Sequence, residues 1–153
     1  VGDFPEARFS PAGLIADGIH VDAATIGVAL RAKRGPGRIF LVTDAMSPTG
    51  TDTMSFELTA RMVYRKDGAL RLADGTLAGA DLTMIDAVAY VHKTLGLPLE
   101  EALRMASRYP AEAIGVGAER GTLALGKPAD FVHLSEDLGM RRTVIGGETA
   151  WAA

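Results

Sequence analysis

The sequence of 153 residues contains no cysteine, no long apolar run and no strong net charge. Without cysteine there are neither disulfide bonds nor thiolate metal sites, which agrees with a cytoplasmic protein. No apolar run is long enough to span a membrane, and the N-terminus lacks the charged and then apolar pattern of a secretory signal. The net charge of −3 offers no broad surface to nucleic acid or to an anionic membrane. A charged small substrate remains open, because local groups decide what a pocket binds.

The composition is that of a soluble globular protein, with 48% hydrophobic and 23% charged residues. A chain of this length buries roughly 70% of the surface that its unfolded form exposes, which is enough for one ordinary domain. The first residue is Val1 rather than methionine, and residues 1–12 show no periodicity. We therefore expect the sequence to begin partway through a larger protein.

An apolar run at residues 39–42 carries a carboxylate, Asp44, just past its end. The run stops at the turn residues 47–50, a pattern typical of a strand buried on both faces of a parallel sheet. In α/β folds the carboxyl ends of such strands hold active-site groups. Asp44 is therefore the first candidate for a catalytic role. The alternative is that it only caps a turn, where aspartate hydrogen-bonds its own backbone.

A second apolar run, residues 13–16, leads to His20. A helix is expected next, with Asp22 as its N-cap and glycines to stop it. Residues 13–43 then form one unit of strand, helix and strand. In such a unit, His20 and Asp44 emerge near the same edge of a parallel sheet.

The middle of the sequence changes to a period of two. Residues 55–72 alternate apolar and polar side chains around the pair Asp67 and Gly68, which predicts a β-hairpin. The small residues at 76–80 predict a loop where the backbone can approach a ligand closely.

The last third predicts helices and then strands. Helical spacing appears at residues 82–95 and again from Pro98, as a first helical residue, up to a break at Pro110. Strands are expected at residues 131–134 and 142–149, the second segment as a hairpin with a Gly-Gly turn.

Five segments resemble, in order and approximate spacing, the N-acetylglucosamine-6-phosphate deacetylases of the amidohydrolase superfamily. They are residues 13–21, residues 41–45, residues 75–79 with 82–84, residues 106–111 with 113–115, and residues 121–123 with 126–130. The resemblance extends over about residues 13–150. The segment that ends at His20, followed by Asp44, is far more specific to the deacetylases than residues 126–130, which many amidohydrolases share.

The fold implied by this resemblance is α/β: the C-terminal portion of a (β/α)8 TIM-type barrel, plus part of a small β-sandwich domain. Residues 1–118 would belong to the barrel, with an inserted β-hairpin at about residues 55–75, and residues 119–153 to the small β domain. The last two barrel strands would end at His20 and Asp44. A piece with two barrel strands leaves strand edges unpaired. We therefore expect a truncated or cleaved protein, or a chain that a partner completes.

The resemblance also implies a reaction, in which metal-activated water hydrolyses the acetamide of N-acetylglucosamine 6-phosphate to glucosamine 6-phosphate and acetate. Asp44 takes the role of general base and acid. The residues implied to bind the substrate are Asp17, Gly18, Ile19, His20, Leu77, Ala78 and Gly79. Asp17 has the alternative of only shaping its turn. Ala78 stands where the family commonly has serine, so its contact would come from the backbone.

The cofactor implied is a divalent metal, zinc. Its ligands in the family, a glutamate and two histidines, lie on earlier barrel strands, so no metal ligand is assigned here and the fragment alone is expected to be inactive. The implied partners are a phosphorylated amino sugar and, for the complete chain, a second copy in a homodimer. Two alternatives stay open. One is another amidohydrolase, acting on a different acetamido sugar or a cyclic amide, and the other is a sugar-phosphate-binding module without the metal site.

Overall fold

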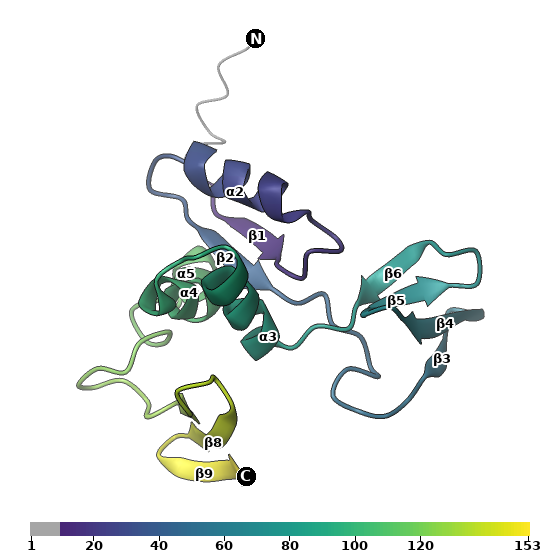
Figure 1. Cartoon of the computed structure of the whole chain (residues 1–153). Coiled ribbons are helices and arrows are strands. Elements are labelled where there is room, and N and C mark those ends of the chain that lie inside the picture. The colour runs from purple at the N-terminus through teal and green to yellow at the C-terminus, as the bar shows by residue number, and fades with distance from the viewer. Residues whose placement is uncertain (1–9) are drawn as a thin grey trace.

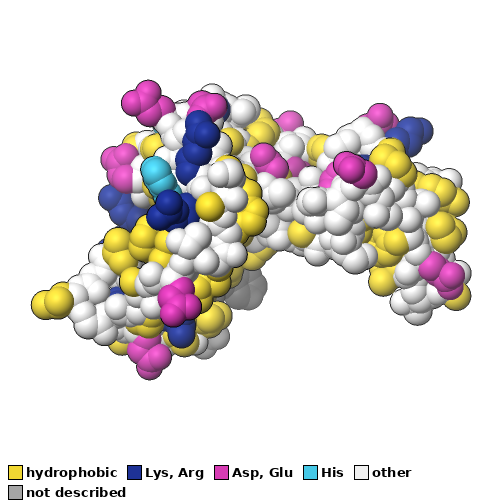
Figure 2. Space-filling view, turned by 90° about the horizontal axis from the view of Figure 1, so that it is seen from below, with side chains coloured by type: hydrophobic (Ala, Val, Ile, Leu, Met, Phe, Trp, Pro, Cys, Tyr) yellow, Lys and Arg dark blue, Asp and Glu magenta, His cyan; other side chains and the backbone are white. Residues whose placement is uncertain are grey.

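The computed structural model describes residues 10–153, which form three β-sheets and a group of helices (Figure 1). The expectations for residues 1–9 lie outside the described residues. A parallel pair of strands lies beside the helices, a four-stranded antiparallel sheet projects to one side, and a three-stranded antiparallel sheet lies at the C-terminal end. Figure 2 shows a narrow neck between the four-stranded sheet and the rest of the molecule.

The predicted unit of strand, helix and strand is confirmed. Strands β1 (Ala12–Ile15) and β2 (Ile39–Val42) pair in parallel, and helix α2 (Ala23–Ala32) connects them. Asp22 caps the helix as predicted, because its side chain accepts hydrogen bonds from the backbone N–H groups of residues 24 and 25. The unit therefore delivers two strand ends to one edge of the sheet.

Strand β2 is less buried than its apolar sequence predicts. Leu41 is buried, whereas Ile39, Phe40 and Val42 remain partly exposed. Helices α4 and α5 pack against β2, but within residues 10–153 its only strand neighbour is β1. The apolar side chains of β2 therefore keep surface that further strands or side chains could cover.

The four-stranded sheet contains the predicted hairpin and one strand more. Its strands, in sheet order, are β3 (Ser55–Leu58), β4 (Arg61–Lys66), β5 (Ala69–Leu72) and β6 (Leu77–Ala80). Asp67 and Gly68 form the turn between β4 and β5, both with positive φ, as predicted. The loop predicted at residues 76–80 is wrong, because Leu77–Ala80 pairs with β5 as a strand. The four-stranded sheet, called the inserted sheet below because it contains the expected hairpin insertion, therefore extends past residue 75.

The helical segment differs from prediction at its boundaries. It consists of α3 (Met84–Ala89), the π-helical segment η1 (Tyr90–Thr94), α4 (Leu99–Ala106) and α5 (Arg108–Ala113). Pro98 is the N-cap of α4 instead of its first residue, and the break falls at Ser107 instead of Pro110. Pro110 fits inside α5 because it lies in the first turn, where backbone N–H groups have no partner within the helix.

The C-terminal sheet is confirmed in its strands and its turn. It contains β7 (Phe131–Leu134), β8 (Met140–Ile145) and β9 (Glu148–Ala152), all antiparallel. Gly146 and Gly147 connect β8 to β9 with positive φ, which glycine adopts without strain.

The main hydrophobic core lies between the parallel strands and the helices. Its largest fully buried side chains are Ile26, Leu41, Val88, Val91 and Met105. In the part of the chain that is described, no helix is both long enough and apolar enough to cross a membrane. The core fixes the orientation of β1 and β2, and with it the positions of the turns that follow them.

Candidate active site

The turn after β1 is built around the carboxylate of Asp17. Its Oδ1 atom accepts hydrogen bonds from the backbone N–H groups of Ile19 and His20, both at 2.9 Å. Its Oδ2 atom lies 2.6 Å from Nδ1 of His20. The side chains of Asp17 and His20 are only 6% and 13% exposed. Asp17 thus both shapes the turn and holds the imidazole ring.

The charge state of Asp17 follows from these contacts. Burial raises the pKa of its carboxyl, but the hydrogen bonds from the His20 side chain and from the backbone N–H groups outweigh burial, so that the pKa lies below its ordinary value. A carboxylate can only accept, so Nδ1 of His20 donates to it. In the neutral ring, Nε2 is then an acceptor. It is buried and has no hydrogen-bond partner in the described part of the chain.

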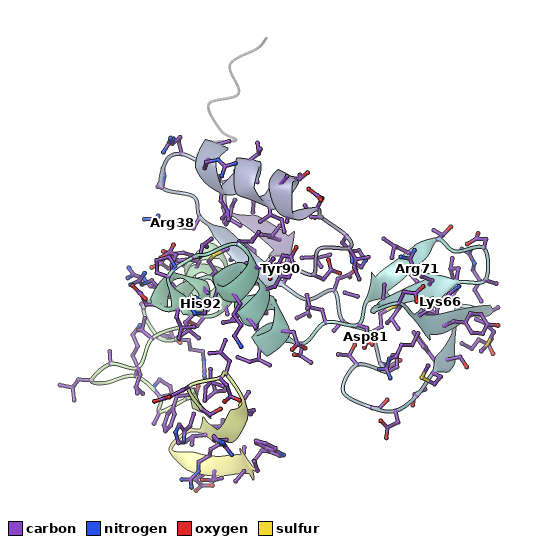
Figure 3. The ribbon with its side chains drawn as sticks, in the orientation of Figure 1. Arg38, Lys66, Arg71, Asp81, Tyr90 and His92 are labelled. Carbon is purple, nitrogen blue, oxygen red and sulfur yellow. The ribbon has the colours of Figure 1, made fainter. Side chains whose placement is uncertain are left out.

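Two neighbours close over this turn. A Cβ atom on Gly18, whose φ is +74°, would lie 2.5 Å from the hydroxyl oxygen of Tyr90 and would clash with it. Tyr90 starts the segment η1 and lies near the end of β1 (Figure 3). On the other side, a Cβ on Gly68 in the turn between β4 and β5 would lie 3.4 Å from the Cδ1 atom of Ile19. The inserted sheet therefore reaches the β1 turn.

The turn after β2 carries Asp44 in an unusual backbone conformation. Asp44 is exposed and has a φ of +54°, in the left-handed region. Its side chain makes no hydrogen bond or ion pair with any residue from 10 to 153. Its backbone is held, because its carbonyl oxygen accepts a hydrogen bond of 2.9 Å from the N–H group of Ala80. An isolated parallel bridge between Ala45 and Ala80 continues this contact.

Strand β6 brings the predicted sugar-binding residues beside Asp44. A Cβ atom on Gly79 would lie 2.7 Å from the Cγ and Sδ atoms of Met46 and 3.1 Å from the carbonyl oxygen of Asp44. Gly79 therefore packs closely against the Asp44 turn, while the predicted approach of this backbone to a ligand stays a prediction. Leu77 and Ala78 precede Gly79 on the strand and are partly exposed.

The structure brings the predicted residues to one edge of the sheet. The parallel register pairs Ile15 with Val42, so Asp17 and Asp44 each follow a paired residue by two positions. Strand β6 joins the same edge through Ala80. Tyr90 and Arg65, both in contact with this region, were not predicted from the sequence, because an aromatic residue in a helix and a cation in a strand are ordinary at those positions.

A metal site is not complete within this part of the chain. Across residues 10–153, no three histidine, aspartate or glutamate side chains are arranged to hold a metal ion. The described residues therefore do not fit a divalent cation by themselves.

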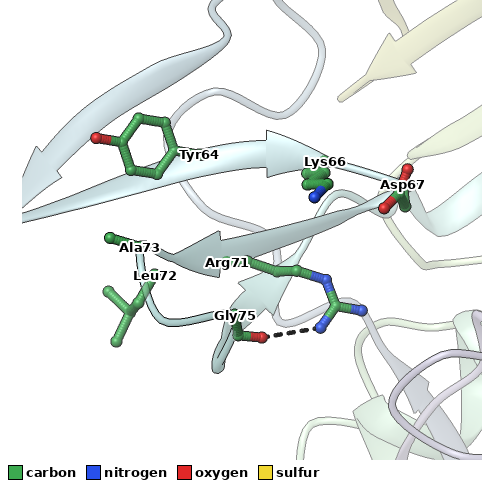
Figure 4. Close-up of a pocket in the computed structure, with 7 residues that line it drawn as sticks. All are labelled: Tyr64, Lys66, Asp67, Arg71, Leu72, Ala73 and Gly75. Atoms are coloured by element: carbon green, nitrogen blue, oxygen red, sulfur yellow. Dashed lines mark hydrogen bonds between the residues drawn. The ribbon is translucent and has the colours of Figure 1, made fainter.

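A shallow depression of about 550 Å³ lies on the four-stranded sheet instead (Figure 4). Tyr64, Lys66 and Arg71 line it, and Nη1 of Arg71 donates to the carbonyl oxygen of Gly75 at 3.0 Å. None of the predicted site residues lines this depression, so it is separate from the strand ends.

Comparison with known proteins agrees with these features. The family model described as "Amidohydrolase family" matches residues 10–150. The chain is 38% identical over 140 residues to N-acetylglucosamine-6-phosphate deacetylase of Vibrio furnissii, covering 92% of the chain and 35% of the relative. It is 42% identical over 141 residues to N-acetylgalactosamine-6-phosphate deacetylase of Shewanella sp. strain ANA-3, with the same coverage of 92% and 35%.

Solved structures give the same result for the fold. The crystal structure of N-acetylglucosamine-6-phosphate deacetylase from Pasteurella multocida superposes with a TM-score of 0.86 at 37% identity, covering 94% of this chain and 37% of that one. The deacetylase from Thermotoga maritima gives 0.83 at 34% identity, covering 94% and 39%. The chain spans about a third of the length of the curated relatives, namely the 35% that it covers of each.

Proposed function

We propose that this chain, which belongs to the amidohydrolase family, forms the C-terminal part of a deacetylase for a 6-phosphorylated N-acetylamino sugar. The reaction is hydrolysis of the acetamide of N-acetylglucosamine 6-phosphate to glucosamine 6-phosphate and acetate. The likeness to named deacetylases over nine-tenths of the chain supports it, for example the 92% covered by the Vibrio furnissii relative. The main structural support for this proposal is that four of the predicted residues lie at the same edge of the parallel sheet. Strands β1, β2 and β6 bring them there, and they are Asp17, His20, Asp44 and Gly79.

In this proposal Asp44 is the general base and then the general acid. Its carboxylate is exposed, and no donor among residues 10–153 competes for its lone pairs. It takes a proton from the attacking water and returns that proton to the departing amine. The hydrogen bond from Ala80 to its backbone limits where the carboxylate can lie.

His20 is proposed to bind the sugar through Nε2, which lacks a partner in the described chain and accepts a hydrogen bond from a sugar hydroxyl or amide N–H. Asp17, whose two oxygens are already used, acts through His20 by fixing its ring and tautomer. Gly18 and Ile19, which lie between Asp17 and His20 in the same turn, are proposed to contact the sugar as well. Backbone groups of residues 77–79 line the sugar beside Asp44.

The complete protein is proposed to bind a divalent metal, zinc, which lowers the pKa of a bound water and so supplies the nucleophile. Residues 10–153 do not gather its ligands, so the remainder of the protein would supply them. The same proposal assigns residues 1–118 to a (β/α)8 barrel and residues 119–153 to a small β domain. It also gives the complete protein a cytoplasmic location and a homodimeric state.

A second candidate is the epimeric substrate, N-acetylgalactosamine 6-phosphate. The 42% identity to the Shewanella deacetylase named for this sugar favours it. An amidohydrolase that acts on a different amide, and a sugar-phosphate-binding module without the metal, are the remaining candidates.

A substrate panel on the full-length protein tests these proposals. Acetate release is measured from N-acetylglucosamine 6-phosphate, N-acetylgalactosamine 6-phosphate and the sugar without phosphate. Asp44→Asn is expected to lower kcat by about 10²- to 10⁴-fold while sugar phosphate still binds. Undiminished turnover in Asp44→Asn contradicts its proposed role. Binding without any turnover in the unmodified protein favours the binding module.

A further inference from the structure

Arg65 lies on β4 of the four-stranded sheet, and its side chain donates hydrogen bonds to the segment that follows Asp44. Its Nη1 atom donates to the carbonyl oxygen of Thr51 at 2.6 Å, and Nη2 donates to that of Pro48 at 2.6 Å. Nη2 also donates to Oδ1 of Asp81 at 3.1 Å. Nε lies 2.7 Å from Oδ2 of Asp81 but is not aligned to donate, so that contact is an ion pair.

The ion pair of this set is partly shielded from water. The side chains of Arg65 and Asp81 are 17% and 19% exposed, so each compensates the charge of the other in a partly buried pair. Hydrogen bonds from a charged guanidinium are shorter and stronger than neutral ones. Its planar fork presents two separate nitrogens to these acceptors in a fixed geometry, whereas lysine offers its donors from a single ammonium nitrogen on a flexible stem.

The two segments that Arg65 contacts, one at Pro48 and Thr51 and the other at Asp81, both adjoin the Asp44 turn. Asp81 directly follows Ala80, whose N–H group donates to the carbonyl oxygen of Asp44. Pro48 and Thr51 lie in the segment that leaves Asp44, where the N–H group of Thr51 donates to the carbonyl oxygen of Pro48. Figure 3 shows Asp81 at the base of the four-stranded sheet, between the sheet and the helices. Arg65 therefore joins the two segments that flank the Asp44 turn.

The Asp44 turn has reason to need such support. A non-glycine residue with a φ of +54° is in a sparsely populated conformation. Such a conformation persists only when its surroundings impose it. The side chain of Asp44 does not contribute, because it has no partner in residues 10–153.

We propose that Arg65 is a positioning residue, which fixes the backbone of the Asp44 turn and so sets where the catalytic carboxylate lies. The inserted sheet then serves the reaction as well as the fold. This inference rests on the proposed function, because it assigns Arg65 to act through Asp44.

The first experiment measures kcat and KM in the full-length protein for Arg65→Met, Arg65→Lys and the control Arg71→Met. Arg71 lies on the neighbouring strand β5, and its side chain donates to the carbonyl oxygen of Gly75, away from the Asp44 turn. Misplacing a catalytic group by about an ångström costs roughly a hundredfold in rate. Arg65→Met is expected to lower kcat by that factor with little change in KM, Arg65→Lys to lower it less, and Arg71→Met to leave it unchanged.

A double-mutant cycle separates positioning from simple stability. In the Asp44→Asn background, Arg65→Met should cause no further loss of kcat, because the group that it positions is already gone. A further hundredfold loss would show that Arg65 acts independently of Asp44 and would overturn the proposal.

Hydrogen exchange gives a readout that does not depend on activity. In Arg65→Met the N–H groups of Thr51 and Ala80 should exchange at least about tenfold faster. The N–H group of Gly147, in the turn between β8 and β9, donates to the carbonyl oxygen of Ala129, and its exchange rate should not change. Unchanged exchange at Thr51 and Ala80 would overturn the proposal. If the unmodified protein hydrolyses no acetamido sugar, the proposed function fails, and the exchange result alone decides whether Arg65 holds the turn.

Discussion

The two turns at the edge of the parallel sheet are built in opposite ways. The β1 turn is held by Asp17, whose carboxylate accepts hydrogen bonds from the backbone N–H groups of Ile19 and His20 and from the His20 ring. These partners are at most three positions away in the sequence. The β2 turn is held by Arg65, which joins residues 14 to 17 positions away. The first turn is local, with the side chains of Asp17 and His20 mostly buried. The second has an exposed Asp44 and depends on a distant sheet. Because the two turns have different supports, we expect that each can be loosened without the other.

The largest effect is expected from removing the partner of Arg65. Asp81→Leu leaves a partly buried guanidinium without its carboxylate and should lower the free energy of unfolding by about 3 kcal/mol. Asp52→Leu, an exposed position in the same segment, is the matched control. Urea denaturation of the full-length protein measures both. Hydrogen exchange should speed up at Thr51 and stay unchanged at His20. Equal effects at both turns would contradict their independence.

A smaller effect is expected from crowding the contact between β6 and the Asp44 turn. Gly79→Ala adds a methyl group 2.7 Å from the Met46 side chain and 3.1 Å from a backbone oxygen. The side chain can move and the backbone cannot, so we expect a loss of about 2 kcal/mol in the free energy of unfolding. Adding Met46→Ala should recover part of this loss. No recovery would mean that the backbone contact alone sets the cost.

Asp17→Asn tests the local turn. Losing charge-assisted hydrogen bonds should cost about 1.5 kcal/mol at neutral pH. The pKa of Asp17 is lowered on folding, so its contribution is complete above the ordinary carboxyl value of 3.8 and is lost as the pH falls below that value. The difference in stability between the unmodified protein and Asp17→Asn should therefore shrink below that pH. A difference that persists in stronger acid would contradict this linkage.

The same variant should change the tautomer of His20. An asparagine amide at position 17 can donate to Nδ1, which moves the ring proton to Nε2. Nitrogen-15 spectra near pH 8 distinguish the two forms. His92, whose Nδ1 lies 2.7 Å from the carbonyl oxygen of Leu97, should keep its proton on Nδ1, and the exposed His133 serves as a solvent reference. An unchanged His20 signal would show that Asp17 does not set the tautomer.

The smallest effect is expected away from both turns. Asp22→Ala removes the N-cap of α2, in which the side chain accepts from two backbone N–H groups, and should cost about 1 kcal/mol. Activity and hydrogen exchange at both turns should stay unchanged. A change in the His20 tautomer like the one expected for Asp17→Asn would mean that the helix, and not the local hydrogen bond, orients His20.

What the sequence predicts well is what short segments determine. The N-cap at Asp22, the turn at Asp67 and the parallel pairing of β1 with β2 depend on residues close together or on simple apolar patterns. Strand β6 escapes prediction because small residues resemble a loop, and only pairing with β5 and Ala45 makes them a strand. Arg65 escapes it for a related reason, since its partners are set by the folded sheet.

The candidate site shows the same division. His20 and Asp44 can be selected from the sequence because they follow apolar runs and match a family pattern, and the structure brings both strand ends to one edge. Their catalytic and binding roles stay predictions. The sequence predicts an approach of the Gly79 backbone to a ligand, which stays a prediction, whereas the contact of Gly79 with Met46 is identified only by the folded chain.

The π-helical segment has a consequence of its own. The N–H group of Leu95 bonds to the carbonyl oxygen of Tyr90, five positions earlier, so this turn contains one residue more than an α-helical turn. Deleting Lys93, which is exposed, would let the segment wind as a regular helix and gain better-aligned bonds. It would also rotate the residues on one side of the deletion relative to the other. Either Tyr90 would leave Gly18 or the following leucines would leave the core. The extra residue of the π-helical turn thus allows Tyr90 to pack against Gly18 while the leucines that follow still pack against the core.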